Sequence, residues 1–497
     1  MKKTIIFFCL FFTFCLNAKV LKVVGPLEIK GLEPTKAGYI YSRLQIAENL
    51  MTIDNNGEIK ANLAKSWDVS KDGLTWSFKL RDDVIFHDGS KFNANIVSFN
   101  LNREELLKKS ILRYLPLEKI YAENTNTLIV KLKTPFIALP SYFVHYSTVI
   151  LAKSSFDEKG KVKKVIGTGA FEIANITIPI AIKVKRFDNW WNGKAKVENI
   201  SYTSVSKNET RALMMKTHQS DIAFSLLPIS LKSLKRDSHL NTETVTIFRT
   251  RKLKVNSGSE FLSDKRVRHA ISYALDRKGI SKVILHNESL AATQMLPPSM
   301  PLWHNKDIEP LKQDITKAKA LLKEAGWIKA KDGFVYKDNK KFAIDLITYS
   351  NWPELPMIAT AVQSQLKEIG IDLKVSITNS SEVVRRHKDN SLQLALISKN
   401  FTLVPNAIAA LLQDYGKKGG SWGAMNWESK EMIETLELLK KEDNPQLYYK
   451  ITKILQEDLP TIPLTWSDLA VVYSKHLKGL KVDPFEISYN LSDVSFK

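Results

Sequence analysis

Strand-like and helix-like segments alternate along most of this chain of 497 residues, without an internal repeat. The alternation favours α/β lobes over an all-β sandwich, and the length is enough for two or three domains. Residues 66–80 show period-two spacing of apolar side chains on both sides of Lys71-Asp72-Gly73 and predict a β-hairpin. Residues 460–480 are again strand-like, which predicts that the chain crosses back to its first lobe near its end.

The second half of the chain carries the helical patterns. Residues 263–280 place apolar side chains along one face behind a capping Ser263 or Asp264, and they predict one helix. Residues 314–327 predict a second helix, and residues 357–377 predict a third helix with a strand after it; glycine ends both of these helices. This βα alternation predicts a second lobe.

The first eighteen residues have the make-up of a secretory signal peptide, with Lys2 and Lys3, an apolar run and then the small Ala18. The run is too short for a stable anchor, and no later segment reaches the roughly 18–20 apolar residues that a membrane span needs. Cys15 raises the alternative of lipoprotein processing, but the bulky residues before it do not suit that processing. The sequence therefore predicts an exported, periplasmic protein.

Both cysteines, Cys9 and Cys15, lie in this predicted leader. A mature chain would then have no disulfide, thiolate metal ligand or cysteine nucleophile. The formal net charge of +21 raises the question of nucleic-acid binding, but the lysines are scattered rather than gathered in an aromatic-lined basic stripe. We therefore expect a solvated basic surface and no nucleic-acid partner.

Motifs for catalysis and metal binding are weak. None of the nine histidines forms an i, i+4 pair or a His-Glu-x-x-His motif, so a zinc site made by the protein is not expected, and no Gly-x-Ser-x-Gly elbow occurs. IGTGAF (166–171) lacks the third glycine of a phosphate loop and predicts a tight turn. LRDDVIFHDGSKFNA (80–94) gathers acids around His87, where alternation predicts a hairpin and its solvent face. The sequence thus predicts no enzyme and no cofactor, with a secreted metallohydrolase as a remote alternative.

Aromatic residues flanked by Asn or Gly are better candidates for a binding site. They are Trp190, Trp191, Trp303, Trp352, Trp422 and Trp427, all in predicted loops. Such loops can line a ligand cleft, and the alternative is that the rings fill the core. We predict that Trp352, Trp422 and Trp427 contact a ligand.

Six blocks along the chain resemble, in the same order, the solute-binding proteins of ABC importers in the oligopeptide/dipeptide/nickel group. They are ENLMTIDNNGEIKANLAKSWDVSKDGLTWSFKLRDDVIFHDGSKFNA (48–94), IGTGAFEI (166–173), RFDNWWNGKAKVENISY (186–202), TRALMMKTHQSDIAF (210–224), VRHAISYALDRKGI (267–280) and DITKAKALLKEAGW (314–327). No single block is specific to this family, but six blocks in the family's order over nearly the whole mature chain are specific to it. The hairpin block is most similar to the nickel-type members.

The resemblance implies a two-lobed α/β clamshell of the class II periplasmic-binding-protein type, with an extra subdomain in the first lobe. Lobe I would cover residues 19–250 with the subdomain at about 66–185, lobe II would cover 251–469, and residues 470–497 would return to lobe I. A ligand that touches both lobes would stabilise the closed form, which an ABC permease with its ATPase subunits recognises. The resemblance therefore predicts a monomeric binding protein that makes and breaks no bond.

The choice of ligand depends on a block late in lobe II. Peptide-binding members carry there an acid, in D-x-P or D-P, that holds the ligand's α-ammonium. The similar place here, SKNFTLVPNAIAALLQDY (398–415), has Val404 before Pro405 and Asn406 after it, so the expected acid is missing. This departure favours a nickel-type metal chelate over a di- or oligopeptide. Asn400 and Phe401 are the predicted ligand contacts in this block.

Nickel-type members bind a metal held by a small organic chelator, so few protein ligands are needed. The arginine that they place ahead of an APSxF-like block is absent from SYFVHYSTVILAKSSF (141–156), which offers His145 and Tyr146 instead. Arg43 is the candidate replacement, with Tyr39 beside it. His145 is the candidate metal ligand, and a structural role is the alternative for such a lone histidine.

Overall fold

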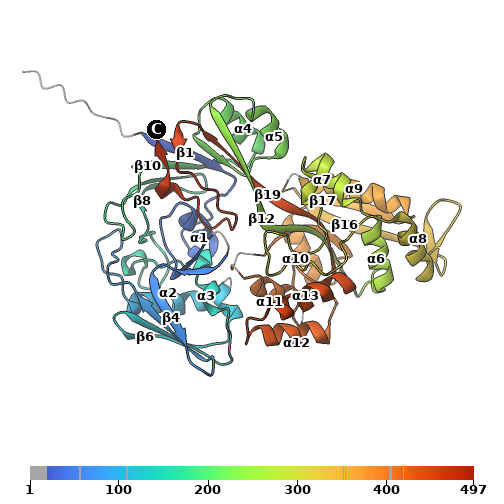
Figure 1. The fold of residues 1–497 in the computed structure, drawn as a ribbon, viewed down its shortest axis with the longest axis horizontal. Helices are drawn as coiled ribbons and strands as arrows, with labels where there is room; N and C mark the ends of the chain where they lie inside the picture. Colours follow the sequence, from blue (N-terminus) through green and yellow to red (C-terminus); the bar gives the residue numbers. More distant parts are fainter. Residues whose placement is uncertain are drawn as a thin grey trace, which may run out of the picture.

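The computed structural model describes residues 19–54, 57–107, 110–350, 352, 354–401, 404, 406–417 and 419–497. The predicted leader (1–18) and Pro405 lie outside this part of the chain. The described residues form two α/β lobes joined by two long strands (Figure 1), so the fold class predicted from the sequence is confirmed. Among them, no helix has both the length and the apolar character to cross a membrane.

A ten-stranded sheet runs through both lobes. Its central strands are β12 (Leu240–Val255) and β19 (Thr461–Ser474), which pair antiparallel along their length with a shift of register between Ile247 and Thr250. The lobe boundaries expected at 250/251 and 469/470 lie inside these two strands.

The other strands of this sheet divide between the lobes. Lobe I contributes, in spatial order from β19, β11 (Ile222–Phe224), β1 (Val20–Gly25), β10 (Asn199–Ser204), β9 (Ala181–Arg186) and β8 (Phe171–Thr177). Lobe II contributes, in order from β12, β18 (Leu394–Asn400), β16 (Ala343–Tyr349) and β17 (Asp372–Thr378). β1 is parallel to β10 and β11, and β16 is parallel to β17 and β18, as expected for βα units.

A separate four-stranded antiparallel sheet lies at the end of lobe I that is remote from β1 (Figure 1). It consists of β4 (Ala64–Val69), β5 (Thr75–Leu80), β7 (Thr127–Leu132) and β6 (Leu117–Asn124), in that order, and α2 (Ala94–Glu105) packs on β6. β4 and β5 form the predicted hairpin, and Trp76, Phe78 and Leu80 point into the core. We call this sheet with α2 the subdomain. β8 and β9 belong to the large sheet.

The segment 263–280, predicted as one helix, forms two. α6 (Lys265–Ala274) begins after the capping Asp264, as predicted, and α7 (Arg277–Ile284) begins after Asp276. The Asp276 carboxylate accepts a hydrogen bond from the backbone N–H of Gly279 at 2.8 Å. A second cap inside the apolar pattern therefore starts a new helix, which the periodicity alone did not reveal.

The helix predicted at 314–327 is confirmed as α8 (Ile315–Glu324), and the helix and strand predicted at 357–377 are confirmed as α9 (Glu354–Glu368) and β17. Further helices are α1 (Pro34–Arg43), α3 (Leu139–Tyr142), α4 (Asn208–Lys216), α5 (Pro228–Leu234), α10 (Ser380–Lys388), α11 (Ile408–Tyr415), α12 (Lys430–Leu439) and α13 (Pro445–Asp458).

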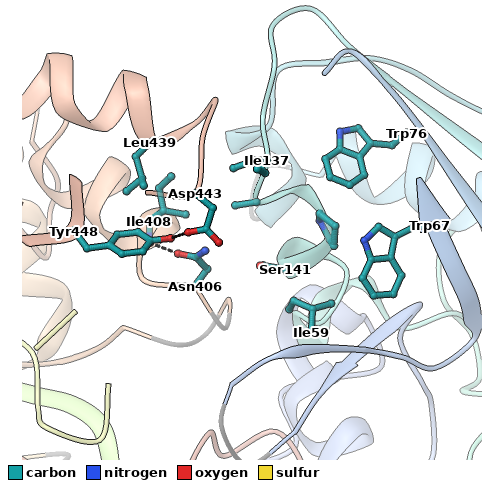
Figure 2. A pocket seen from close by; sticks show the side chains of 12 residues that line it. Ile59, Trp67, Trp76, Ile137, Ser141, Asn406, Ile408, Leu439, Asp443 and Tyr448 are labelled. Atoms are coloured by element: carbon teal, nitrogen blue, oxygen red, sulfur yellow. Dashed lines mark hydrogen bonds between the residues drawn. The ribbon is translucent and has the colours of Figure 1, made fainter. Parts of the chain in front are cut away.

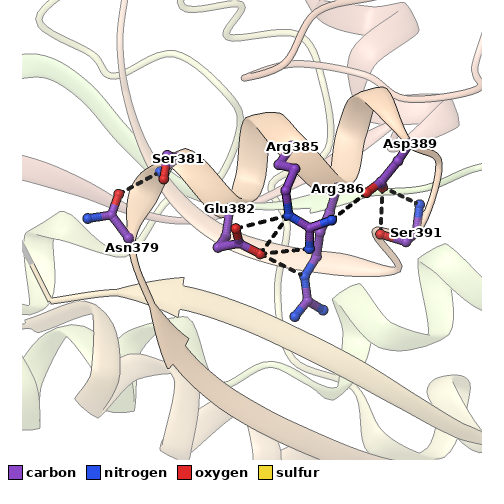
Figure 3. Close-up of polar contacts among 7 residues, drawn as sticks. All are labelled: Asn379, Ser381, Glu382, Arg385, Arg386, Asp389 and Ser391. Atoms are coloured by element: carbon purple, nitrogen blue, oxygen red, sulfur yellow. Dashed lines mark hydrogen bonds and ion pairs between the residues drawn. The ribbon is translucent and has the colours of Figure 1, made fainter.

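Helix α10 illustrates how this basic chain arranges its surface charge (Figure 3). Asn379 caps the helix by accepting the Ser381 N–H at 2.9 Å. Arg385 lies 2.8 Å from a carboxylate oxygen of Glu382 and 2.6 Å from one of Asp389, so acid and base alternate at i, i+3 and i, i+4 spacing. On this helix Arg385 and Arg386 thus pair with acids.

Each lobe has its own hydrophobic core, and a third cluster joins the lobes. Leu21, Ile40 and Phe171 belong to the core of lobe I, and a second core lies around β16 and β18. The third cluster extends from Phe78 of the subdomain to Tyr448 on α13 of lobe II. Because this cluster continues across the boundary, the two lobes are in contact and the clamshell is closed.

Candidate ligand-binding cleft

The hinge end of the cleft is built around Arg249, at the register shift of β12. Its Nη2 atom lies 2.9 Å from Oε2 of Glu486, and the Asn400 side-chain amide donates to the same oxygen at 3.3 Å. The guanidinium carbon is 4.5 Å from the centre of a Trp352 ring, a cation–π contact. Arg249 and Glu486 are 14% and 13% exposed, so their ion pair has limited solvent access. Trp352 and Asn400 of lobe II contact this pair, which lies where the lobes meet at the hinge.

The wall of lobe I is formed by α1 and by the turn at Tyr146–Thr148. Arg43 Nη1 donates to the Tyr39 carbonyl at 2.9 Å, one helical turn away, and the Tyr39 and Tyr146 rings meet edge to face at 5.8 Å. Burial raises the pKa of Tyr39 to about 12. Gly38 permits this approach, because a Cβ there would lie 2.2 Å from the Tyr146 carbonyl oxygen. The predicted contacts Tyr39, Arg43 and Tyr146 therefore do lie together.

His145 is 6% exposed and caps the same turn. Its Nδ1 atom accepts the backbone N–H of Ser147 at 3.2 Å and lies 2.9 Å from the Ser147 hydroxyl. Its ring centre is 4.1 Å from that of Tyr146, and burial lowers the pKa of the imidazole to about 3. The imidazole is thus neutral at physiological pH, one nitrogen is engaged in the turn, and its role as a metal ligand stays a prediction.

The C-terminal segment connects the lobe I wall to the hinge. The Tyr489 N–H donates to the Arg43 carbonyl at 3.0 Å. The Asp483 carboxylate accepts three backbone N–H groups, from Phe485, Ile487 and Ser488, at 2.8–2.9 Å, and so fixes the turn that presents Glu486. Arg249 and Glu486 are functional candidates that the sequence analysis missed, because 237 residues separate them and neither belongs to a motif.

The other predicted aromatic contacts are more closely tied to the framework. Phe401 is 1% exposed and its backbone N–H donates to the Phe248 carbonyl, so it belongs to the core. Trp422 meets the Tyr349 ring edge to face at 6.1 Å. Trp427 donates through Nε1 to Asp458 at 3.2 Å. Trp352 differs from these three residues, because its ring packs against the Arg249 guanidinium.

Trp190, Trp191 and Trp303 have structural contacts. Both indole N–H groups of the pair donate to the Glu48 carboxylate, at 3.2 and 3.0 Å. Trp303 is 4% exposed and packs on Tyr448 with ring centres 4.2 Å apart.

The glycines of IGTGAF allow two backbone segments to meet. A Cβ at Gly167 would lie 2.1 Å from the Ile46 carbonyl oxygen, and one at Gly169 would lie 2.2 Å from that of Gln45. The imidazole Nε2 of His87 lies 3.0 Å from the Gly169 carbonyl oxygen. His87 and this glycine pair therefore support the framework of lobe I.

A cavity of about 260 Å³ lies between the subdomain and lobe II (Figure 2). Trp67, Trp76 and Ile137 line it from the subdomain side. On the lobe II side the Tyr448 hydroxyl donates to Asp443, and both burial and this acid raise its pKa. The cavity thus has aromatic and aliphatic side chains on the subdomain side and polar groups, Asn406, Asp443 and Tyr448, on its lobe II wall.

Two hydrogen bonds close the cleft beside this cavity. The Ile137 N–H donates to the Lys440 carbonyl at 2.7 Å, from subdomain to lobe II. The Gln413 amide donates to the Tyr114 hydroxyl at 3.0 Å, also between these two parts. The cavity with Asp443 and the arginine-containing groups around Arg43 and Arg249 are thus separate parts of the candidate site. Concave surfaces with a few charged and aromatic groups are typical of sites for small charged molecules.

The profile of one protein family, described as bacterial extracellular solute-binding proteins, family 5 (middle), matches residues 58–422, which is more than half of the chain. The chain belongs to this family. This match confirms the membership predicted from the six sequence blocks. Family 5 binding proteins work with the permease and ATPase components of ABC importers.

Relatives within this family have different ligands in their names. The glutathione-binding protein GsiB of Shigella flexneri is 26% identical over 454 residues, which cover 88% of this chain and 86% of that protein. NikZ from Campylobacter jejuni in complex with Ni(L-His) has a TM-score of 0.82 at 24% identity, over 96% of this chain and 99% of the other. The oligopeptide-binding protein AppA from Bacillus subtilis in complex with a nonapeptide has a TM-score of 0.79 at 22% identity, over the same shares. These two structures establish the shared fold.

Proposed function

We propose that this family 5 binding protein captures a nickel-type metal chelate between its lobes and delivers it, outside the cytoplasm, to an ABC permease. Two arginines support this proposal: Arg43, beside Tyr39 and Tyr146 in lobe I, and Arg249, against Trp352 at the hinge. Guanidinium groups bind carboxylates in bidentate fashion, and a chelator that holds a metal through amine, imidazole and carboxylate groups presents carboxylates.

Among the described residues, His145 is the one side chain that we propose as a metal ligand at this site. A site with one protein ligand suits a chelated metal ion better than a bare one. His145 offers one imidazole, and its Nδ1 is engaged by Ser147. A transition-metal ion needs four or more ligands, so most would come from the chelator. NikZ, which has the same fold, forms a complex with Ni(L-His), and Ni(L-His) is a ligand of this kind.

A short peptide is the second candidate, and two acids favour it. The acid expected at 404–406 is missing, but Asp443 lines the cavity beside Asn406, and Glu486 lies at the hinge. Either carboxylate could pair with a peptide ammonium, although Asp443 is bonded to Tyr448 and Glu486 to Arg249. The glutathione-binding relatives agree with this candidate.

Native mass spectrometry of the protein purified from its own extracytoplasmic compartment, with elemental analysis, separates the candidates. We expect a co-purifying metal together with a small organic molecule. We also expect metal-free protein to bind nickel with histidine more tightly than either component alone. A co-purifying peptide without metal would overturn the chelate proposal and favour the second candidate.

Variants test the proposed contacts. Removal of Arg43 (Arg43→Ala) should weaken binding of nickel with histidine about tenfold, the loss expected for one charge-assisted hydrogen bond. Two variants of His145 separate a role as metal ligand from a role in capping the turn. His145→Ala removes both, whereas His145→Asn keeps an acceptor for the Ser147 N–H. Arg385→Ala, on the surface helix α10, is the matched control. If Arg43→Ala and both His145 variants bind like the control, these residues do not form the site.

A further inference from the structure

Three metal-ligating side chains meet on the surface of lobe I, where α4 ends and β12 begins. His218 follows α4, and Asp237 and His239 precede β12. Their ligand atoms all lie within 4.8 Å of one another, the one such group of three that the described residues contain. The spacing is Asp-x-His with a second histidine 19 residues earlier, so a search for i, i+4 pairs and His-Glu-x-x-His passes over it.

The Asp237 carboxylate is the centre of the group. One oxygen, Oδ1, accepts the His239 backbone N–H at 2.8 Å and lies 3.3 Å from His239 Nδ1. The other, Oδ2, lies 4.0 Å from His218 Nε2. Two atoms that are each about 2.0–2.2 Å from a tetrahedral ion are separated by roughly 3.4 Å. The pair of Asp237 and His239 already has this separation. The pair of Asp237 and His218 is longer, and the two histidine nitrogens, which lie within 4.8 Å, also have to approach each other; both changes need only rotation of the exposed imidazoles.

The backbone beneath the group is held by packing. Met215, three residues before His218, is 0% exposed, and Leu240, directly after His239, is 4% exposed. Both belong to one cluster of buried residues with Leu234, between α4, α5 and the central strands. The two histidine side chains are 54% and 75% exposed, so the ligand atoms are open to solvent while their attachment points are fixed.

We propose that His218, Asp237 and His239 form a surface site for a divalent transition-metal ion, with the remaining coordination positions open to water. Two imidazoles and one carboxylate suit zinc, nickel or copper, and they do not suit Mg²⁺ or Ca²⁺, which prefer oxygen ligands. Nine residue-to-residue steps along β12 separate Leu240 from Arg249, a length of about 30 Å at strand rise. The surface site therefore lies outside the cleft and does not depend on the ligand proposed there.

The test is titration of ZnCl₂ into metal-free protein without any chelating ligand, followed by calorimetry. We expect one ion per chain at this site, competition by NiCl₂, and no effect of MgCl₂ in equal amount. His218→Asn, His239→Ala and Asp237→Asn should each weaken zinc binding at least about tenfold, since even loss of an outer-shell partner of a metal costs roughly 10–100-fold. Asn is chosen at His218 because the backbone there has φ of +55°, which Asn tolerates.

His286→Asn is the matched control, because His286 is also exposed and has φ of +53°. It should bind zinc like the wild type. A second readout is thermal unfolding: ZnCl₂ should raise the Tm of the wild type and of the control but not of the three site variants, all of which should match the wild type in EDTA. Zinc binding of unchanged affinity and stoichiometry in His218→Asn and His239→Ala would overturn the proposal. Site variants with a lower Tm than the wild type in EDTA would also count against it, because the side chains would then stabilise the protein without zinc.

Discussion

Asp414 of lobe II lies close to three lysines, of which Lys252 and Lys254 are buried and Lys399 is 11% exposed. It lies 2.9 Å from Lys399 Nζ and 4.0 Å from Lys252 Nζ. Lys254 Nζ donates to the carbonyls of Gly420 and Gly423 at 3.0 and 2.6 Å. Burial lowers the pKa of Lys252 to about 8 and that of Lys254, with a contribution from Lys252, to about 7. The excess of cations means that charged Lys252 costs stability at neutral pH.

We expect Lys252→Met to stabilise the protein at pH 7. A lysine with a lower pKa in the folded state binds fewer protons when folded, so the free energy of unfolding rises with pH between about 8 and 10.5, and the full cost is present below pH 8. Methionine removes this cost, Lys399 still neutralises Asp414, and the Tyr415 hydroxyl keeps its 2.6 Å contact with Thr461. The gain should be roughly 1–3 kcal/mol in urea unfolding at pH 7.

The gain should shrink at pH 10, where wild-type Lys252 is largely neutral in the folded protein. Lys319→Met, on the exposed side of α8, serves as control and should change stability by less than about 0.5 kcal/mol. Lys252 Nζ also donates to the Tyr415 hydroxyl at 2.9 Å. A variant that is less stable than the wild type at pH 7 would mean that this hydrogen bond outweighs the cost of the buried charge.

At the scale of elements, the break between α6 and α7 depends on one side chain. Leu275 is extended (φ −85°, ψ 115°) and Asp276 then caps α7 through the Gly279 N–H. Asp276→Ala should lower the free energy of unfolding by about 1 kcal/mol in urea unfolding, because one N–H at the start of α7 loses its acceptor.

Asp276→Asn keeps an acceptor at the same position and should recover most of this loss. If the Asn and Ala variants were equally destabilised, the charge of Asp276 rather than its hydrogen bond would be responsible.

At the scale of the whole molecule, hydrogen bonds at the mouth of the clamshell add to the hydrophobic cluster that joins the lobes. The Tyr114–Gln413 hydrogen bond joins the segment after α2 to lobe II, and separation of the lobes would break it. Tyr114→Phe removes it without touching the cleft residues. Because the lost bond stabilises the closed form alone, binding of nickel with histidine should weaken about two- to fivefold, and the radius of gyration of the free protein in small-angle X-ray scattering should increase.

Tyr336→Phe is the matched control, since it also removes a hydroxyl that is hydrogen-bonded, to Asp332 at 2.7 Å, but on a hairpin of lobe II. It should leave affinity and radius of gyration unchanged. A Tyr114→Phe protein indistinguishable from this control would show that the contact does not bias opening and closing.

The fold was largely predictable because its signals are local. The hairpin of β4 and β5, the cap of α6 at Asp264 and the glycine ends of α8 and α9 depend on residues a few positions apart. The same holds for Arg43 and Tyr39, which lie one helical turn apart and were predicted together. The break at Asp276 was missed because an apolar pattern can continue over two helices.

What the sequence by itself determined is the family, the α/β architecture and the local elements, because short-range hydrogen bonds, caps and periodicity specify them. Only the tertiary structure decided the sites. Arg249 meets Glu486 because β12 and the C-terminal segment converge at the hinge, and His218 meets Asp237 because α4 and β12 share a core. Contacts between residues that are distant in the chain follow from packing, and no local pattern records them.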